Sequence, residues 1–168
     1  RPASLYGAAK AATSLAALAG AGRLGLSLAW ARPFFCYGVG EPEGRLAGDL
    51  VRGLAAGRTV DCTDGLQRRD FMQTEDIGAA LAALLASDVT GPVNIGAGQA
   101  IAVRDLILAI AGAMGRADSV RLGARARPHD DPPLIAADVT RLRAAVGFRH
   151  RHDLVSGVAA LLAAEVAS

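Results

Sequence analysis

The sequence predicts an α/β fold in which at least some of the strands pair in parallel. Along the 168 residues, segments with helical spacing of apolar residues alternate with short apolar runs that end at glycine or proline. Strands that are separated by helices are typical of parallel pairing, because a parallel strand needs a long crossover connection. Hydrophobic residues make up 52% of the chain, which indicates a folded core rather than a disordered chain.

Helices are expected where Ala- and Leu-rich segments contain no proline, or where apolar residues fall on one side of a helical spacing. Thr74 should cap one helix at its amino end, and Gly115 should end another. The glycines of residues 20–25 should stop the first helix and form a turn. The expected helices span residues 5–18, 46–56, 75–86, 103–114, 139–146 and 154–166.

Strands are expected at four short apolar segments, and the Arg-rich stretch 121–133 is expected to be looser. Residues 20–25 fit the letters of a GxGxxG dinucleotide loop, but they end a helix and lead into a strand, which is the reverse of the required order. If a cofactor binds, its phosphate loop is therefore expected outside this chain. The expected strands span residues 26–35, 59–62, 70–73 and 92–95.

Composition excludes several classes of function. The net charge of +2 is too small to indicate nucleic-acid binding, and no apolar stretch approaches the roughly 20 residues that cross a bilayer. Cys36 and Cys62 are expected to be small hydrophobic residues in a reducing, cytoplasmic setting. The three histidines have no metal-ligand spacing, so no metal site is expected and they should lie on the solvated surface: His129, His150 and His152.

Tyr6 and Lys10 are the residues that indicate chemistry. They stand four apart near the start of a helix, which places them on the same face, about 6 Å apart along the axis. An ammonium beside a phenol favours the phenolate, the form that exchanges a proton with an alcohol near neutral pH. Lys10 is also the one lysine among 18 basic residues, which suggests a position where a compact ammonium is needed.

Five segments, in order along the chain, resemble the extended short-chain dehydrogenase/reductase family, in particular its NAD-dependent epimerase/dehydratase members that modify nucleotide sugars. The first is Pro2-x-Ser4-x-Tyr6-Gly7-x-x-Lys10, which is similar to the active-site segment of the family. The others are Ala31-Arg32-Pro33-Phe34-Phe35-Cys36-Tyr37-Gly38, Arg69-Asp70-Phe71 with Glu75-Asp76, Asn94-Ile95-Gly96-x-Gly98 with Val103-Arg104-Asp105, and Arg127-Pro128-His129-Asp130 with Val146-Gly147-Phe148.

The resemblance implies roles for single residues. Tyr6 would be the general acid/base at a sugar hydroxyl, and Lys10 would hold the ribose of a nicotinamide cofactor, NAD or NADP. Pro33 and Phe34 would line the nicotinamide pocket. The substrate-binding residues would be Phe35, Arg69 and Arg127, the two arginines gripping the diphosphate of a nucleotide sugar, and Asp130, which would orient groups near them. Asp76 is expected only to favour the start of its helix.

The resemblance also implies the domain organisation. Residues 1–40 would end a Rossmann-like NAD(P)-binding domain, and residues 41–168 would form mainly a small α/β substrate-binding region with some segments returning to the Rossmann sheet. The family's glycine-rich loop and catalytic Ser or Thr precede the Tyr6 segment. We therefore expect a carboxy-terminal fragment that is inactive alone. The apolar segment 8–18 would allow a homodimer.

The function that follows is epimerisation or 4-ketoreduction of a nucleotide sugar. Phe35 stands where many members carry an asparagine that touches the substrate, which argues against a standard galactose-type epimerase. Two alternatives stay open: a non-catalytic protein that binds a nucleotide sugar or NAD, and a reductase for a carbonyl compound that is not a sugar.

Overall fold

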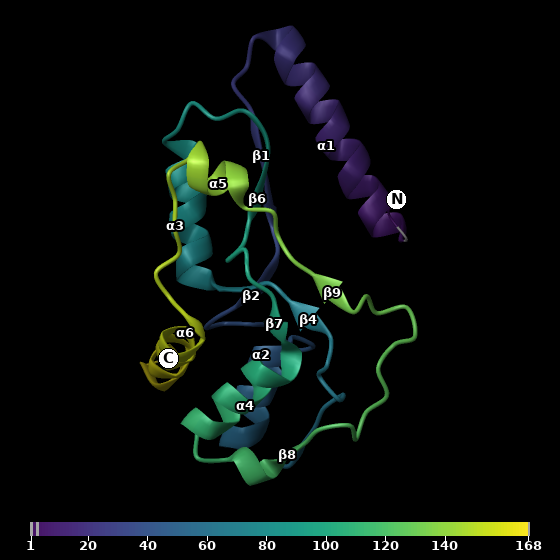
Figure 1. Cartoon of the computed structure of the whole chain (residues 1–168), viewed down its shortest axis with the longest axis vertical. Helices are drawn as coiled ribbons and strands as arrows, with labels where there is room; N and C mark the ends of the chain where they lie inside the picture. Colours follow the sequence, from purple (N-terminus) through teal and green to yellow (C-terminus); the bar gives the residue numbers. More distant parts are fainter. Residues whose placement is uncertain (1, 3, 168) are drawn as a thin grey trace.

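The computed structural model describes residues 2 and 4–167, and its strands pair mainly in parallel. β1 (Ala29–Pro33) pairs in parallel with β6 (Gly91–Ile95), and β2 (Phe35–Tyr37) pairs in parallel with β5 (Phe71–Gln73). Helix α3 (Thr74–Leu85) packs against all four of these strands (Figure 1). This arrangement confirms the predicted α/β fold with parallel pairing.

The upper body in Figure 1 contains α3, β1, β6 and the short helix α5 (Thr140–Ala144), which contacts β6. Asp138 accepts a hydrogen bond from the N–H of Thr140 at 2.9 Å and so supports the start of α5. Apolar side chains between these elements form the upper core: Met72, Ala80, Leu84, Val93, Ile95, Ala137, Val139 and Leu142.

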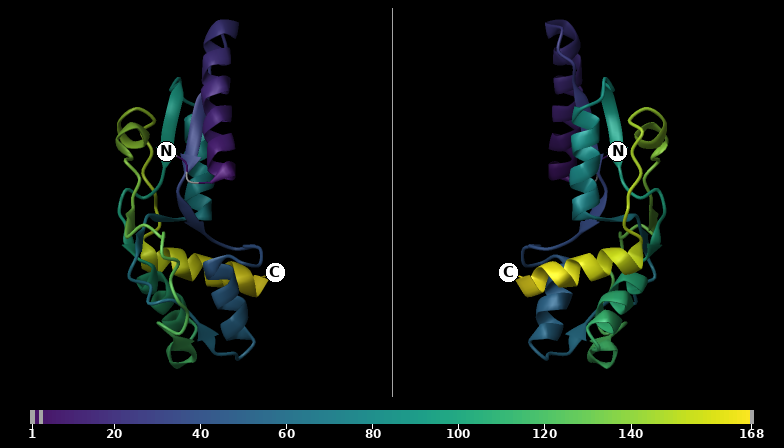
Figure 2. Two further views of the ribbon diagram at one scale, coloured as in Figure 1. Left: turned by 90° about the vertical axis from the view of Figure 1, so that its right-hand side faces the viewer. Right: turned by 90° about the vertical axis from the view of Figure 1, so that its left-hand side faces the viewer.

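The lower body is built from three helices. α2 (Leu46–Ala55) packs on α4 (Val103–Ala113), and α4 packs on α6 (Leu154–Ala167), which crosses beneath the upper body in both views of Figure 2. Their buried side chains form the lower core: Tyr37, Ala47, Leu50, Val51, Leu54, Cys62, Val103, Leu106, Ile107, Ile110, Ala111, Val158 and Leu161.

Five two-residue strands connect these parts. β3 (Val60–Asp61) pairs in parallel with β8 (Val120–Arg121), which follows the 3-10 turn Ala117–Ser119. β4 (Arg68–Arg69) lies between two partners: it is antiparallel to β7 (Ile101–Ala102) and parallel to β9 (Leu134–Ile135). These ladders hold the two ends of the exposed segment 122–133.

The first helix is longer than predicted. α1 (Leu5–Leu24) passes through the glycines at residues 20 and 22 and ends at Gly25, whose φ of 65° is the left-handed conformation of a helix C-cap. A glycine inside a helix costs only about 1 kcal/mol relative to alanine, so it need not end one. α1 stands beside the upper body, with Ser14 and Ala21 as its buried residues (Figures 1 and 2).

Two other local predictions are wrong. The expected strand 26–35 is divided at Phe34, because β1 pairs with β6 while β2 turns away to pair with β5. The N-cap of α3 is Gln73, not Thr74: the Gln73 side chain accepts a hydrogen bond from the N–H of Glu75. Gln73 is buried at the end of β5, so its amide is held where the helix begins.

Among the helices of the described residues, none combines the length and the apolar character that a bilayer crossing requires.

Candidate functional site

Tyr6 and Lys10 lie on the same face of α1. Ser4 caps the helix by accepting a hydrogen bond from the N–H of Gly7 at 3.1 Å, which fixes the first turn. The Lys10 Nζ lies 5.7 Å from the centre of the Tyr6 ring. Tyr6 is 73% exposed, so both the phenol and the ammonium can be reached from solvent.

A surface hollow of about 380 Å³ lies beside Lys10, between α1 and β1. Its helix side contains Lys10 and the buried Ser14, and its strand side contains Trp30 and Arg32. The hollow therefore combines an ammonium, a guanidinium and a large aromatic surface.

Pro33 and Phe34, the residues expected beside a nicotinamide, lie at the carboxyl end of β1. Pro33 is exposed, whereas Phe34 is half-buried against the upper core, and its N–H donates to the Ile95 carbonyl at 2.9 Å. The carboxyl ends of parallel strands are the usual place for ligands in α/β folds. Their predicted role in binding the cofactor stays a prediction.

Arg69 is buried, with an exposed fraction of 4%. One end of its guanidinium donates to the backbone carbonyl of Arg68 at 2.8 Å, and the other forms a hydrogen-bonded ion pair with Asp131. The Phe35 ring covers the group, with its centre 5.5 Å from the Arg69 Cζ. The structure thus brings together Phe35 and Arg69, two of the predicted substrate-binding residues, and adds Asp131.

Arg127 and Asp130, the other two predicted substrate-binding residues, lie in the exposed segment 122–133. Arg127 approaches Asp64 at 3.9 Å, a loose pair between two partly exposed side chains. Within residues 2 and 4–167, no hydrogen bond or ion pair joins Arg69 to Arg127 or Asp130. A shared diphosphate clamp therefore stays a prediction.

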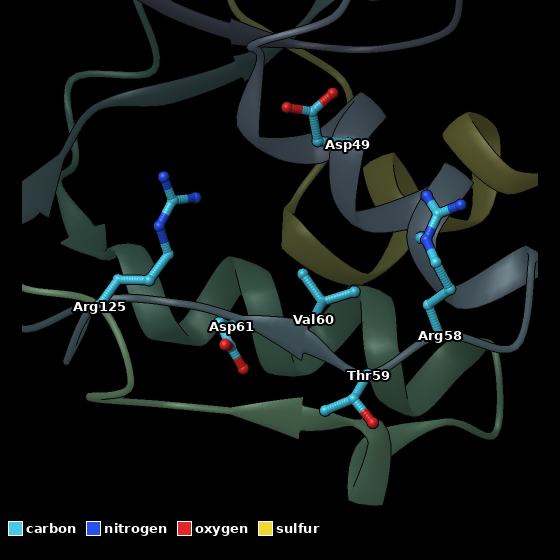
Figure 3. Close-up of a pocket in the computed structure, with 7 residues that line it drawn as sticks. Asp49, Arg58, Thr59, Val60, Asp61 and Arg125 are labelled. Atoms are coloured by element: carbon cyan, nitrogen blue, oxygen red, sulfur yellow. The ribbon is translucent and has the colours of Figure 1, made fainter.

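A second hollow, of about 390 Å³, lies along β3 and is bordered by basic residues (Figure 3). Arg58 and Arg125 stand at its two ends, on either side of Val60. Asp61 is already neutralised by Arg121, which donates two hydrogen bonds to it at 2.7 and 2.9 Å and lowers the pKa of that carboxyl. Asp49 also lines the hollow and pairs with Arg52 at 2.7 Å, which leaves Arg58 and Arg125 as the groups that could attract an anionic ligand.

Asp70 organises the loop after β6, a role that the sequence did not reveal. Its fully buried carboxylate accepts hydrogen bonds from the N–H groups of Ala97, Gly98 and Ala137 at 2.8, 2.9 and 3.0 Å. A Cβ on Gly96 would lie only 2.7 Å from the Ala137 side chain, so the loop needs glycine there. Asp70 therefore holds the loop that precedes β7 and the segment that follows β9. These are the two strands that pair with β4, which carries Arg69.

Asp76 and His152 also differ from their predicted roles. Asp76 was expected only to favour a helix start, but it is buried and accepts hydrogen bonds from the N–H groups of Arg151 and His152 at 3.1 and 2.9 Å. The His152 Nδ1 lies 3.0 Å from the same carboxylate. The prediction of a solvated His152 is therefore wrong, because its backbone and ring are both tied to α3.

A smaller cavity of about 240 Å³ lies next to this pair. Burial, together with the negative charges of Asp153 and Asp76, raises the pKa of Tyr37 to about 12, so its phenol stays neutral at ordinary pH. Tyr37 is thus unsuited to replace Tyr6 as an acid/base group. The cavity is lined by Tyr37, Phe71, Ala97, Gln99, Ile101, His150, His152, Asp153 and Leu154.

Asp131 is the residue of this site that sequence reasoning missed. It follows Asp130, the residue that matches the family pattern Arg127-Pro128-His129-Asp130. The acidic doublet was the available signal, but nothing local shows which of the two carboxylates turns inward.

Solved structures match this fold over nearly the whole chain. MoeE5, in complex with UDP-glucuronic acid and NAD, is 30% identical, with a TM-score of 0.86 over 99% of this chain and 57% of its own. TunA, an NAD dependent-NDP-hexosamine 5,6-dehydratase involved in tunicamycin biosynthesis, is 27% identical, with a TM-score of 0.85 over 100% of this chain and 55% of its own.

A third structure shows the fold alone. The UDP-N-acetylglucosamine 4-epimerase from Methanobrevibacter ruminantium M1, in complex with UDP-N-acetylmuramic acid, is 23% identical, with a TM-score of 0.83 over 98% of this chain and 55% of its own. The chain therefore spans a little over half the length of the solved structures named here. No curated protein sequence matches it.

The Rossmann-like α/β fold is that of the extended short-chain dehydrogenase/reductases, as the sequence predicted. A sequence model of one family matches residues 1–96, more than half of the chain. The chain belongs to the NAD dependent epimerase/dehydratase family.

Proposed function

We propose that the chain is the carboxy-terminal part of a NAD- or NADP-dependent enzyme that epimerises a nucleotide sugar or reduces its 4-keto group. The observation that carries this proposal is the 5.7 Å separation between the Lys10 Nζ and the centre of the exposed Tyr6 ring. The pair places a proton-exchanging hydroxyl and a positive charge together on one exposed helix face, as a general acid/base with a ribose-binding neighbour requires.

The residues around Lys10 fit the ribose end of a dinucleotide. The ammonium can donate to ribose hydroxyls, and the adjoining hollow offers the aromatic surface of Trp30 and the positive charge of Arg32. Pro33 and Phe34 would border the nicotinamide at the carboxyl end of β1. When bound, the nicotinamide supplies hydride exchange with a sugar carbon. MoeE5 was solved with NAD, and the RMD protein from Pseudomonas aeruginosa with NADPH.

Tyr6 handles the proton. In the oxidising direction the Tyr6 phenolate takes the proton from a sugar hydroxyl as hydride leaves the carbon that bears this hydroxyl. In the reducing direction the Tyr6 phenol returns a proton to the carbonyl oxygen. An epimerase would let the ketone turn and receive hydride on its other face, whereas a 4-ketoreductase would stop after one transfer. In both reactions Lys10 would hold the ribose of the cofactor beside Tyr6.

Arg69 and Arg127 are proposed to bind the diphosphate, with Phe35 and Asp130 beside it. Guanidinium groups match phosphate oxygens with two parallel hydrogen bonds. MoeE5, the 30% identical protein, was solved with UDP-glucose and with UDP-glucuronic acid. A nucleotide sugar is accordingly the substrate class that we propose for this chain.

The setting of the enzyme is also a proposal. The free thiols of Cys36 and Cys62 suit a reducing cytoplasm. Exposed apolar side chains on α1, such as Leu5 and Leu15, would suit a homodimer. The 168 residues alone should not turn over, because no glycine-rich phosphate loop is present among them.

The test is a Tyr6→Phe substitution in the full-length enzyme. Turnover should fall by about a hundred- to ten-thousand-fold, the usual contribution of a general acid/base, while nucleotide-sugar binding persists. Tyr37→Phe is the matched control, because it removes the other tyrosine hydroxyl of these 168 residues and should leave turnover close to wild type.

Unchanged turnover in the Tyr6→Phe enzyme would remove the mechanism. Product analysis separates the remaining possibilities: an inverted sugar centre identifies an epimerase, a reduced 4-position a ketoreductase, and loss of water a dehydratase. A thermal-shift screen with UDP-, dTDP-, GDP- and CDP-sugars should show protection by at least one of them. Protection by none would favour a reductase for another carbonyl compound.

A further inference from the structure

The Arg69 guanidinium is closed off from solvent by a carboxylate of its own chain. The Arg69 side chain is 5% exposed and its partner Asp131 is 23% exposed. Backbone pairing brings the two together: β4 lies parallel to β9 with Arg69 opposite Ile135, and the N–H of Arg68 donates to the Pro133 carbonyl at 2.8 Å. The residues just before β9 therefore run along β4 and carry Asp131 to Arg69.

We propose that Asp131 occupies the position of a ligand phosphate and is exchanged for that phosphate when a nucleotide diphosphate binds. The inference rests on the proposed function, in which Arg69 grips the diphosphate. A buried guanidinium without an anionic partner is strongly unfavourable, and carboxylate and phosphate both match its fork of N–H donors. Arg69 therefore holds one anion or the other, and Asp131 is the anion that the chain itself supplies.

The difference in burial decides which partner moves. Arg69 is held by the Arg68 carbonyl at 2.8 Å and by the Phe35 ring at 5.5 Å, so its guanidinium stays in place. Asp131 lies at the end of the segment 122–133, within a turn closed by its N–H and the Pro128 carbonyl at 3.2 Å. Its partly exposed carboxylate regains hydration at small cost once it leaves Arg69.

This exchange makes Asp131 a specificity-determining residue. A diphosphate carries more negative charge than one carboxylate and can displace it, whereas a nucleoside without phosphate has no group that replaces Asp131. The same segment carries Arg127 and Asp130, so release of Asp131 also frees the residues proposed to close over the ligand. The contact acts as a latch that opens for a phosphorylated ligand.

Isothermal titration of the full-length protein with UDP and with uridine tests the exchange. Asp131→Asn keeps the shape of the side chain but removes its charge, so UDP should bind about tenfold tighter, the gain expected when only one part in ten of the protein is competent beforehand. Uridine binding should not change. Asp118→Asn, an exposed aspartate in the 3-10 turn, should bind both ligands like wild type.

The outcomes separate the latch from the proposed function. If wild-type protein binds UDP and Arg69→Gln abolishes that binding, but Asp131→Asn binds UDP unchanged or more weakly, the latch is wrong and the nucleotide site stands. If neither UDP, dTDP, GDP nor CDP binds wild type or any variant, the nucleotide site itself is wrong.

A measurement on the wild-type protein covers the case in which Asp131→Asn does not fold. The carboxylate carbon of Asp131, assigned by its loss in Asp131→Glu, should shift in ¹³C NMR spectra when UDP saturates the protein. A resonance that stays in place while calorimetry shows bound UDP would overturn the exchange.

Discussion

The carboxylate of Asp76, in the first turn of α3, accepts a hydrogen bond from the backbone N–H of His152 at 2.9 Å and lies 3.0 Å from the His152 Nδ1. These residues are 76 positions apart in the chain. The contact ties the segment before α6 to the helix that packs on β1, β2, β5 and β6. It therefore connects the upper body, which adjoins Tyr6 and Lys10, with the helices of the lower body.

Asp76→Asn should lower the free energy of unfolding by about 2–3 kcal/mol, because an amide in that place leaves buried hydrogen-bonding groups unsatisfied. Urea denaturation at pH 7 measures the loss. Glu75→Gln is the control, since Glu75 is an exposed acid one position earlier in the same helix turn and should change stability by no more than about 0.5 kcal/mol.

The pH dependence of the same variant provides a second outcome. Burial alone would raise the pKa of Asp76, but the N–H groups of His152 and Arg151 and the His152 ring outweigh it, so the pKa lies below 3.8. Because the pKa of Asp76 is depressed in the folded state, its ionised carboxylate stabilises the fold fully above about pH 4. This stabilisation is lost as the pH falls through the pKa that Asp76 has in the folded protein. The stability difference between wild type and Asp76→Asn should therefore narrow below pH 4; a constant difference would contradict this role.

Tyr37→Phe should make the protein less sensitive to alkali. Burial, Asp153 and Asp76 raise the pKa of Tyr37 from 10.0 to about 12, so the folded state favours the neutral phenol more than the unfolded chain does. The neutral Tyr37 phenol thus gives its full contribution to the free energy of unfolding below pH 10. That contribution is lost as the pH rises from 10 to about 12. Urea midpoints of wild type should fall over that range, and those of Tyr37→Phe should fall less.

The exposed Tyr6 provides the control for this experiment, because Tyr6→Phe should keep the alkaline loss of the wild-type protein. If Tyr37→Phe loses as much stability between pH 10 and 12 as wild type does, ionisation of the buried phenol is not the cause.

Features that depend on neighbouring residues could be predicted from the sequence. The shared face of Tyr6 and Lys10 follows from helix geometry at a spacing of four, and the Lys10 Nζ indeed lies near the Tyr6 ring. The helices at residues 46–56, 75–86 and 103–114 were also placed within about a turn of their observed ends, because their apolar spacing is regular.

Features that depend on distant partners could not be predicted. The two-residue strands β4 and β9 are too short to show alternation, yet they decide that Asp131 rather than Asp130 meets Arg69, 62 positions away. His152 was assigned to the surface because no local pattern links it to Asp76. The strand 26–35 reads as continuous because a change of pairing partner at Phe34 leaves no mark in its composition.

Gly157→Ala should destabilise the protein through the contact between α6 and β2. A Cβ on Gly157 would lie 2.1 Å from the Tyr37 hydroxyl and 3.0 Å from the ring carbon that bears it, so the ring or the helix must shift. Overpacking of this kind costs about 1–3 kcal/mol, measurable by urea denaturation. Gly112→Ala in α4 is the matched control: nothing lies within 4 Å of its Cβ, and alanine there should add about 0.5–1 kcal/mol.

A double variant shows whether the hydroxyl is the cause. Combining Gly157→Ala with Tyr37→Phe removes the atom 2.1 Å away and leaves the ring carbon at 3.0 Å, so part of the lost stability should return. No recovery would mean that the alanine disturbs α6 by another route, and a Gly157→Ala protein as stable as Gly112→Ala would show that α6 does not press against Tyr37. Recovery would establish that this glycine lets α6 approach the tyrosine that closes one wall of the 240 Å³ cavity.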